Sequence, residues 1–127
     1  MTKIFQAEQS SKTPLIELNP ETGVFEIRGK SIPENTVIFY KPLLEWLDTY
    51  SIEPAPQTAV DIQLDYFNTS SAKIFADIFR KMEKLHVSGK SSITINWRYQ
   101  DIDDDMLEAG EGFQSITKVP FNLISFT

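Results

Sequence analysis

The stretch that decides the fold runs from residue 60 to residue 85 and reads VDIQLDYFNTSSAKIFADIFRKMEKL. Its first seven residues alternate apolar and polar side chains, which predicts a strand with one buried face. From residue 74 to residue 85 the apolar side chains recur at helical spacing, which predicts an amphipathic helix. Four polar residues form the junction: Asn68, Thr69, Ser70 and Ser71. The stretch therefore predicts a strand that passes into a helix through a hydroxyl-rich turn.

Upstream of this stretch, two short apolar runs at residues 15–18 and 24–27 flank the sequence NPETG, which predicts a β-hairpin whose second strand is closed by Gly29. Residues 31–36 combine a capping residue, a proline and an acid, as helix starts do. Apolar residues continue at helical spacing to Tyr50. Pro42 lies inside this pattern, and we expect it to kink the helix or to begin a second segment.

Downstream, residues 93–97 alternate like residues 60–66 and predict another strand, after a helix stop at residues 88–90. Residues 103–110 predict a short acidic helix, and residues 120–126 predict a last strand. The element order is a hairpin followed by α-β-α-β-α-β, so the later strands should pair in parallel. Because the strands alternate, we expect an α/β fold with a mixed sheet and helices mainly on one face. Residues 1–12 should form a partly ordered arm, and residues 13–127 a single domain.

Composition excludes several classes of function. The net charge of −6 on 127 residues, with no basic cluster, argues against nucleic-acid binding. The absence of cysteine and the single histidine, His86, exclude thiol catalysis and Cys/His zinc sites. No glycine-rich phosphate loop is present, so we expect no cofactor. Residues 1–12 contain no apolar leader and no segment approaches 18 apolar residues, which predicts a cytoplasmic protein.

The junction is the best candidate for a functional site. Its Asn, Thr and Ser side chains are typical N-caps, which accept hydrogen bonds from the free amides of the first helical turn. A phosphate on Thr69 would lie beside the same amides and the positive end of the helix dipole. Capping and phosphorylation are compatible with each other.

The acidic residues are weaker candidates. Residues 101–105 begin like a calcium-binding EF-hand loop, but Met106 stands where glycine is needed and Gly112 where a glutamate is needed. This stretch is better interpreted as a solvated helix start or an acidic patch that faces a partner. Asp61, Asp65 and Asp77 show no pairing of a nucleophile with a base. His86 is interpreted as a helix-end or surface residue.

Several motifs occur together in one order along the chain. They are YFNTSSAK at residues 66–73 followed by Asp77 and Ile78, GKSIPEN at 29–35, FYKP at 39–42, WL at 46–47, WRY at 97–99, DDDMLEAGE at 103–111 and PF at 120–121. Through them the sequence resembles the SiaC family of bacterial regulatory phosphoproteins, from about residue 15 to residue 126.

The resemblance implies a non-enzymatic switch protein with a fold similar to STAS domains. It implies that a Ser/Thr protein kinase phosphorylates Thr69 and that a PP2C-type phosphatase removes the phosphate. It also implies that the unphosphorylated form binds a diguanylate cyclase, which links the switch to cyclic-di-GMP signalling. The candidate docking residues around Thr69 are Asn68, Ser70, Ser71 and Lys73. Two alternatives stay open: a constitutive scaffold or oligomerisation domain, and a small carboxylate-based enzyme.

Overall fold

The computed structural model of the chain describes residues 2–127. Its elements are, in chain order, β1 (Phe5–Ala7), β2 (Leu15–Leu18), β3 (Val24–Ser31), α1 (Thr36–Tyr50), β4 (Gln57–Phe67), α2 (Thr69–Val87), β5 (Ser92–Gln100), α3 (Asp104–Ile116) and β6 (Phe121–Phe126).

The six strands of residues 2–127 form one mixed sheet, and their order in the sheet is their order in the chain. β1 pairs antiparallel with β2, and β2 pairs antiparallel with β3. The pairs β3–β4, β4–β5 and β5–β6 are parallel, and each of these connections contains one helix. The α/β fold with a mixed sheet, predicted from the order of strands and helices, is confirmed.

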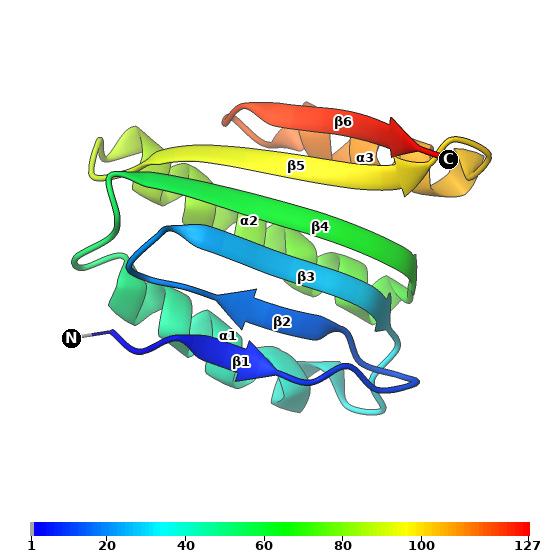
Figure 1. Ribbon diagram of the computed structural model, residues 1–127, viewed down its shortest axis with the longest axis horizontal. Helices are drawn as coiled ribbons and strands as arrows, with labels where there is room; N and C mark the ends of the chain where they lie inside the picture. Colours follow the sequence, from blue (N-terminus) through cyan, green and yellow to red (C-terminus); the bar gives the residue numbers. More distant parts are fainter. Residues whose placement is uncertain (1) are drawn as a thin grey trace.

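The helices α1, α2 and α3 all lie on the same face of the sheet, as Figure 1 shows. In β4 the apolar positions Val60, Ile62 and Leu64 are buried, while the residues between them are partly exposed on the other face. The apolar stripe predicted for the second helix is buried in full: Ile74, Phe75, Ile78, Phe79, Met82 and Leu85. One apolar layer between the sheet and the helices therefore forms the core, and the opposite face of the sheet is left without a helical cover.

The N-terminal segment contains a strand that the sequence did not indicate. β1 extends the predicted hairpin to three strands, and Phe5 and Ala7 pack against the core. The indole N–H of Trp46 on α1 also donates to the backbone carbonyl of Lys3, at 2.6 Å. A strand of three residues with polar neighbours is too short to give a clear alternating pattern. Met1, the first residue of the predicted arm, lies outside the described residues.

The end of β3 differs from the prediction. β3 continues to Ser31, so Gly29 lies within the strand and does not close it. Gly29 has a φ of 115°, a conformation that L side chains rarely adopt. The pairing register with β4 shifts directly after Gly29, and this shift sets Ser31 opposite Phe67. The irregularity therefore aligns the end of β3 with the strand–helix junction after β4.

The helices also differ in their bounds. α1 begins at Thr36 and is capped by Asn35, whose side chain accepts from the amide of Ile38 at 3.1 Å. Pro42 lies inside this single helix and does not begin a second segment. α3 runs to Ile116, beyond the predicted end at residue 110. Glycine is unfavourable inside helices, but Gly110 is buried in α3 against Trp97, and the helix continues past it.

Candidate functional site at the junction of β4 and α2

The junction places Thr69 as the first residue of α2. Phe67 ends β4 and packs its ring against Phe75 and Trp97, which fixes the end of the strand in the core. The next residue, Asn68, has an extended backbone and caps α2, because its side-chain oxygen accepts from the amide of Ser71 at 2.9 Å. The predicted capping role of the junction is thus confirmed, with Asn68 as the cap.

The three hydroxyl residues after Asn68 have different surroundings. Thr69 is exposed, and its hydroxyl makes no hydrogen bond with any side chain or backbone group of residues 2–127. Ser70 is also exposed, but its hydroxyl lies 2.7 Å from the Thr36 hydroxyl and donates to the Asn68 side chain at 3.1 Å. Ser71 is fully buried. Only the Thr69 hydroxyl is both exposed and free of partners within this group.

Ser71 belongs to a buried chain of hydroxyls. Its hydroxyl donates to the backbone carbonyl of Ser31 at 2.9 Å and lies 2.8 Å from the Ser31 hydroxyl. The Ser31 hydroxyl in turn lies 2.5 Å from the hydroxyl of Tyr40 on α1. Burial raises the pKa of Tyr40 to about 12, and the hydrogen bond with Ser31 opposes that increase in part. The chain joins the end of β3 and α1 to the first turn of α2.

The start of α2 is a favourable place for an added negative charge. The amide of Ser71 donates to the Asn68 side chain and that of Ala72 to the Asn68 carbonyl, which leaves the amides of Thr69 and Ser70 without a partner among the described residues. The first turn of α2 carries no acidic side chain, and the exposed Lys73 lies one turn after Thr69. An anion attached to Thr69 would meet the positive end of the helix dipole there.

Known proteins share the sequence pattern and the fold of this chain. Residues 7–126 match the family described as SiaC family regulatory phosphoprotein.

The chain belongs to the SiaC family.

A protein of Pseudomonas aeruginosa strain UCBPP-PA14 is 27% identical over 112 residues, which are 88% of each chain. The solved structure of SiaC of Pseudomonas aeruginosa is similar with a TM-score of 0.88 at 24% identity, over 97% of this chain and 98% of that one. SiaC in its complex with the diguanylate cyclase SiaD, whose activator it is, is similar with a TM-score of 0.90 at 24% identity, over 96% and 99% of the two chains. The structural matches show that the chain has the fold of the SiaC proteins.

The carboxylates considered as a catalytic set do not come together in this member of the SiaC family. Asp61 lies on the open face of the sheet, while Asp77 lies on α2 and pairs with Arg80 on the same helix. Asp65 is exposed near the end of β4. Asp77 therefore lies on the helical side of the sheet, apart from Asp61 on the open face, while Asp65 lies four residues after Asp61 on the same strand (Figure 1).

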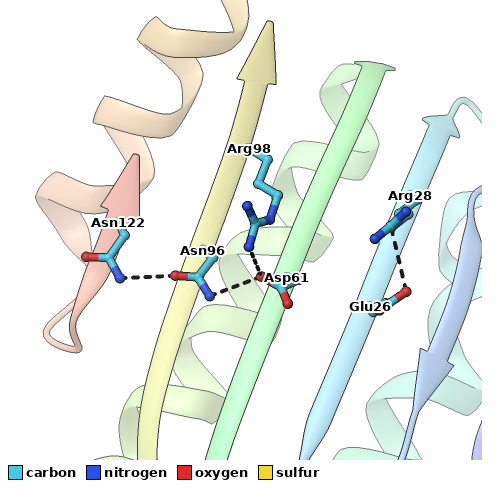
Figure 2. Close-up of polar contacts among 6 residues, drawn as sticks. All are labelled: Glu26, Arg28, Asp61, Asn96, Arg98 and Asn122. Carbon is cyan, nitrogen blue, oxygen red and sulfur yellow. Dashed lines mark hydrogen bonds and ion pairs between the residues drawn. The ribbon is translucent and has the colours of Figure 1, made fainter. Parts of the chain in front are cut away.

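Asp61 instead belongs to a polar row that crosses three strands, which Figure 2 shows. Its carboxylate accepts from the Asn96 side chain at 3.0 Å and from Arg98 at 3.2 Å, and Asn96 accepts from Asn122 at 3.0 Å. This row was not predicted from the sequence. The sequence contained an indication of it, because all four residues are polar and occupy outward positions on the adjacent strands β4, β5 and β6. Only the pairing register, however, shows that they are aligned with one another.

The other candidates have structural partners. The side chain of Asp103 caps α3 by accepting from the amide of Met106 at 3.0 Å, as expected for a helix start. His86 Nδ1 accepts from the amide of Ile93 at 3.0 Å and so connects the end of α2 to β5. Within residues 2–127 no three His, Asp or Glu side chains are grouped in a way that would hold a metal ion. Among the same residues, no helix has the length and apolar character needed to cross a membrane.

Proposed function

We propose that this protein is a non-enzymatic signalling switch that is reversibly phosphorylated on Thr69 and whose phosphorylation state controls its binding to a partner protein. One observation carries the proposal: in a member of a family of regulatory phosphoproteins, Thr69 is the exposed hydroxyl without a hydrogen-bond partner at the start of α2. A Ser/Thr protein kinase and a PP2C-type phosphatase are the enzymes that would add and remove the phosphate.

The phosphate would change the local charge more than the fold. It adds about −1.5 to −2 charges at neutral pH. The free amides of Thr69 and Ser70 and the side chain of Lys73 provide donors within one turn. Because the core beneath the junction is already packed, the phosphorylated residue should stay at the surface. The consequence is a new negative patch on an otherwise unchanged domain.

The surface beside Thr69 is suited to contact another protein. Val37 and Ile38 are each 69% exposed, and both directly follow Thr36, whose hydroxyl contacts Ser70. Tyr66, just before the junction, is 56% exposed. Exposed apolar side chains favour protein binding. A phosphate on Thr69, beside Ser70 and three residues after Tyr66, would oppose a partner that approaches with apolar or acidic groups.

The partner that we propose is a diguanylate cyclase, which would place the switch in cyclic-di-GMP signalling. The support is the SiaC protein of Pseudomonas aeruginosa, which has the same fold and is the activator of the diguanylate cyclase SiaD. In this proposal the unphosphorylated form binds the cyclase, and the surface residues Asn68, Ser70 and Lys73 surround the contact. Ser71, expected from the sequence to join them, is buried and can only support the first turn of α2 from beneath.

The experiment compares three immobilised forms of the protein: unphosphorylated, phosphorylated on Thr69, and Thr69→Ala. Each is incubated with a lysate of the cells that carry it, and the captured diguanylate cyclase is quantified by mass spectrometry. We expect the first and third forms to capture the cyclase and the phosphorylated form to capture at least about tenfold less, because a like-charge contact costs more than 1.4 kcal/mol. Thr49→Ala, at another exposed threonine, is the matched control. Equal capture by the phosphorylated and unphosphorylated forms would instead favour a constitutive scaffold.

A further inference from the structure

The start of α2 carries three consecutive hydroxyls, and a kinase that phosphorylates only one of them must distinguish it from the other two. Thr69, Ser70 and Ser71 are chemically equivalent as phosphate acceptors, and the first two are both exposed. Exposure alone therefore separates Ser71 from the other two but does not separate Thr69 from Ser70. The hydrogen bonds of each residue provide the remaining distinction.

Ser71 is withheld by burial. Its side chain is inaccessible, and both hydrogen bonds of its hydroxyl go to Ser31, on the neighbouring strand. The Ser31 hydroxyl is also hydrogen-bonded with the hydroxyl of Tyr40. Presenting Ser71 to a kinase would require the first turn of α2 to open and would leave these buried groups without partners, which is costly.

The hydroxyl of Ser70 is made less available to a kinase by a hydrogen bond with a residue that is distant in sequence. Its hydroxyl donates to the Asn68 side chain, so the hydrogen of the contact with Thr36 comes from the Thr36 hydroxyl. Thr36 is 7% exposed and is the first residue of α1. The contact exists because the register shift after Gly29 sets Ser31 opposite Phe67, and the amide of Asn68 then donates to the Ser31 carbonyl at 3.1 Å. The starts of α1 and α2 are thereby held side by side.

The two hydrogen bonds of the Ser70 hydroxyl hinder its reaction as a phosphate acceptor. The acceptor oxygen attacks the γ-phosphorus of ATP, the bond from that phosphorus to the β–γ bridging oxygen breaks, ADP leaves, and the hydroxyl proton passes to a base of the kinase. The attacking oxygen needs a free lone pair and freedom to align. The Ser70 oxygen has a lone pair occupied by Thr36 and its hydrogen directed to Asn68, whereas the Thr69 oxygen has neither constraint.

We propose that Thr36 is a specificity-determining residue for phosphorylation: its hydroxyl withholds Ser70, as Ser31 and Tyr40 withhold Ser71, so that the kinase modifies Thr69 alone. The inference rests on the proposed function, because it assumes that Thr69 is the normal acceptor. It adds a role for a residue outside the junction.

The test compares four proteins produced in the cells that carry the chain, with phosphate located by peptide mapping: wild type, Thr69→Ala, and Thr69→Ala combined with Thr36→Val or with Thr36→Ser. Valine keeps the shape of threonine but removes the hydroxyl, and serine restores the hydroxyl. We expect phosphate on Thr69 in the wild type and only background on Ser70 in Thr69→Ala. Adding Thr36→Val should raise phosphate on Ser70 about five-fold to tenfold, the factor that one net hydrogen bond is worth. Thr36→Ser should keep it at background.

Two results would overturn the inference while leaving the proposed function intact. In the first, the wild type is phosphorylated on Thr69, but adding Thr36→Val to Thr69→Ala gives no phosphate on Ser70 above background. In the second, Thr69→Ala alone already carries as much phosphate on Ser70 as the variant that combines it with Thr36→Val. A wild type without phosphate on Thr69 would overturn both the inference and the proposed function. Circular dichroism and thermal unfolding verify that each variant is folded, and Thr36→Ala replaces Thr36→Val if the valine does not fit.

Discussion

The buried hydroxyl of Tyr40 makes the protein less stable as the pH becomes alkaline. Burial raises its pKa to about 12, from about 10 in an unfolded chain. Below pH 10 the hydroxyl is protonated in both states, and its contribution to stability is fully present. Above pH 10 the unfolded state loses the proton first, so the free energy of unfolding decreases as the pH rises toward 12.

We predict that the wild-type protein loses about 1 kcal/mol more stability than Tyr40→Phe between pH 10 and pH 11, because phenylalanine has no proton to lose. Urea unfolding of both proteins at the two pH values measures this difference. The two proteins differ only at residue 40, so contributions from the rest of the chain cancel in the comparison. An identical loss in wild type and variant would show that Tyr40 titrates normally and that its hydroxyl is not held in the buried chain.

At the scale of the elements, the contact between α3 and the sheet depends on one glycine. A side chain on Gly110 would place its Cβ 2.5 Å from Cδ1 of Trp97 and 2.8 Å from Cδ2 of Leu123. Trp97 cannot move away freely, because its indole N–H donates to the carbonyl of Met106 on the same helix at 3.0 Å. The close approach of α3 to β5 and β6 therefore requires glycine at this position.

We predict that Gly110→Ala lowers the free energy of unfolding by about 1–3 kcal/mol, the usual cost of overpacking a core. Gly112 provides a matched control on the same helix, because a Cβ there would meet no atom within 4 Å. Gly112→Ala should raise stability by about 0.5–1 kcal/mol through helix propensity alone. Chemical denaturation of both variants distinguishes the two effects. Equal changes in both would mean that α3 does not pack closely on Trp97.

The molecule as a whole is a mixed sheet, parallel from β3 to β6, that is covered by helices on one face (Figure 1). Parallel sheets usually have both faces covered. Here the row formed by Asp61, Asn96, Arg98 and Asn122 satisfies polar side chains on the open face, as Glu26 and Arg28 do on β3. Polar outward positions explain how these strands remain stable without a second helical layer.

The order of the elements could be predicted because the segments are long and because strands and helices have distinct hydrophobic periods. The helical stripe from Ile74 to Leu85 and the alternation from residue 60 to residue 66 both appear in the structure as predicted. The candidate site was predicted for the same reason, since it lies where one period changes into the other. The contacts that define it were not predictable, because the Ser31–Ser71 bond joins residues 40 positions apart and depends on a register shift that no local pattern indicates.

The proposed switch depends on phosphorylation of Thr69. The most direct test is the intact mass of the protein purified from its native cells under several growth conditions, with peptide mapping and Thr69→Ala as the control. We expect a form of the protein that is heavier by one phosphate, with the phosphate on Thr69 and absent from the variant. A protein that carries no phosphate under any condition, or carries it elsewhere with Thr69 unmodified, would show that Thr69 is not the site of a phosphorylation switch.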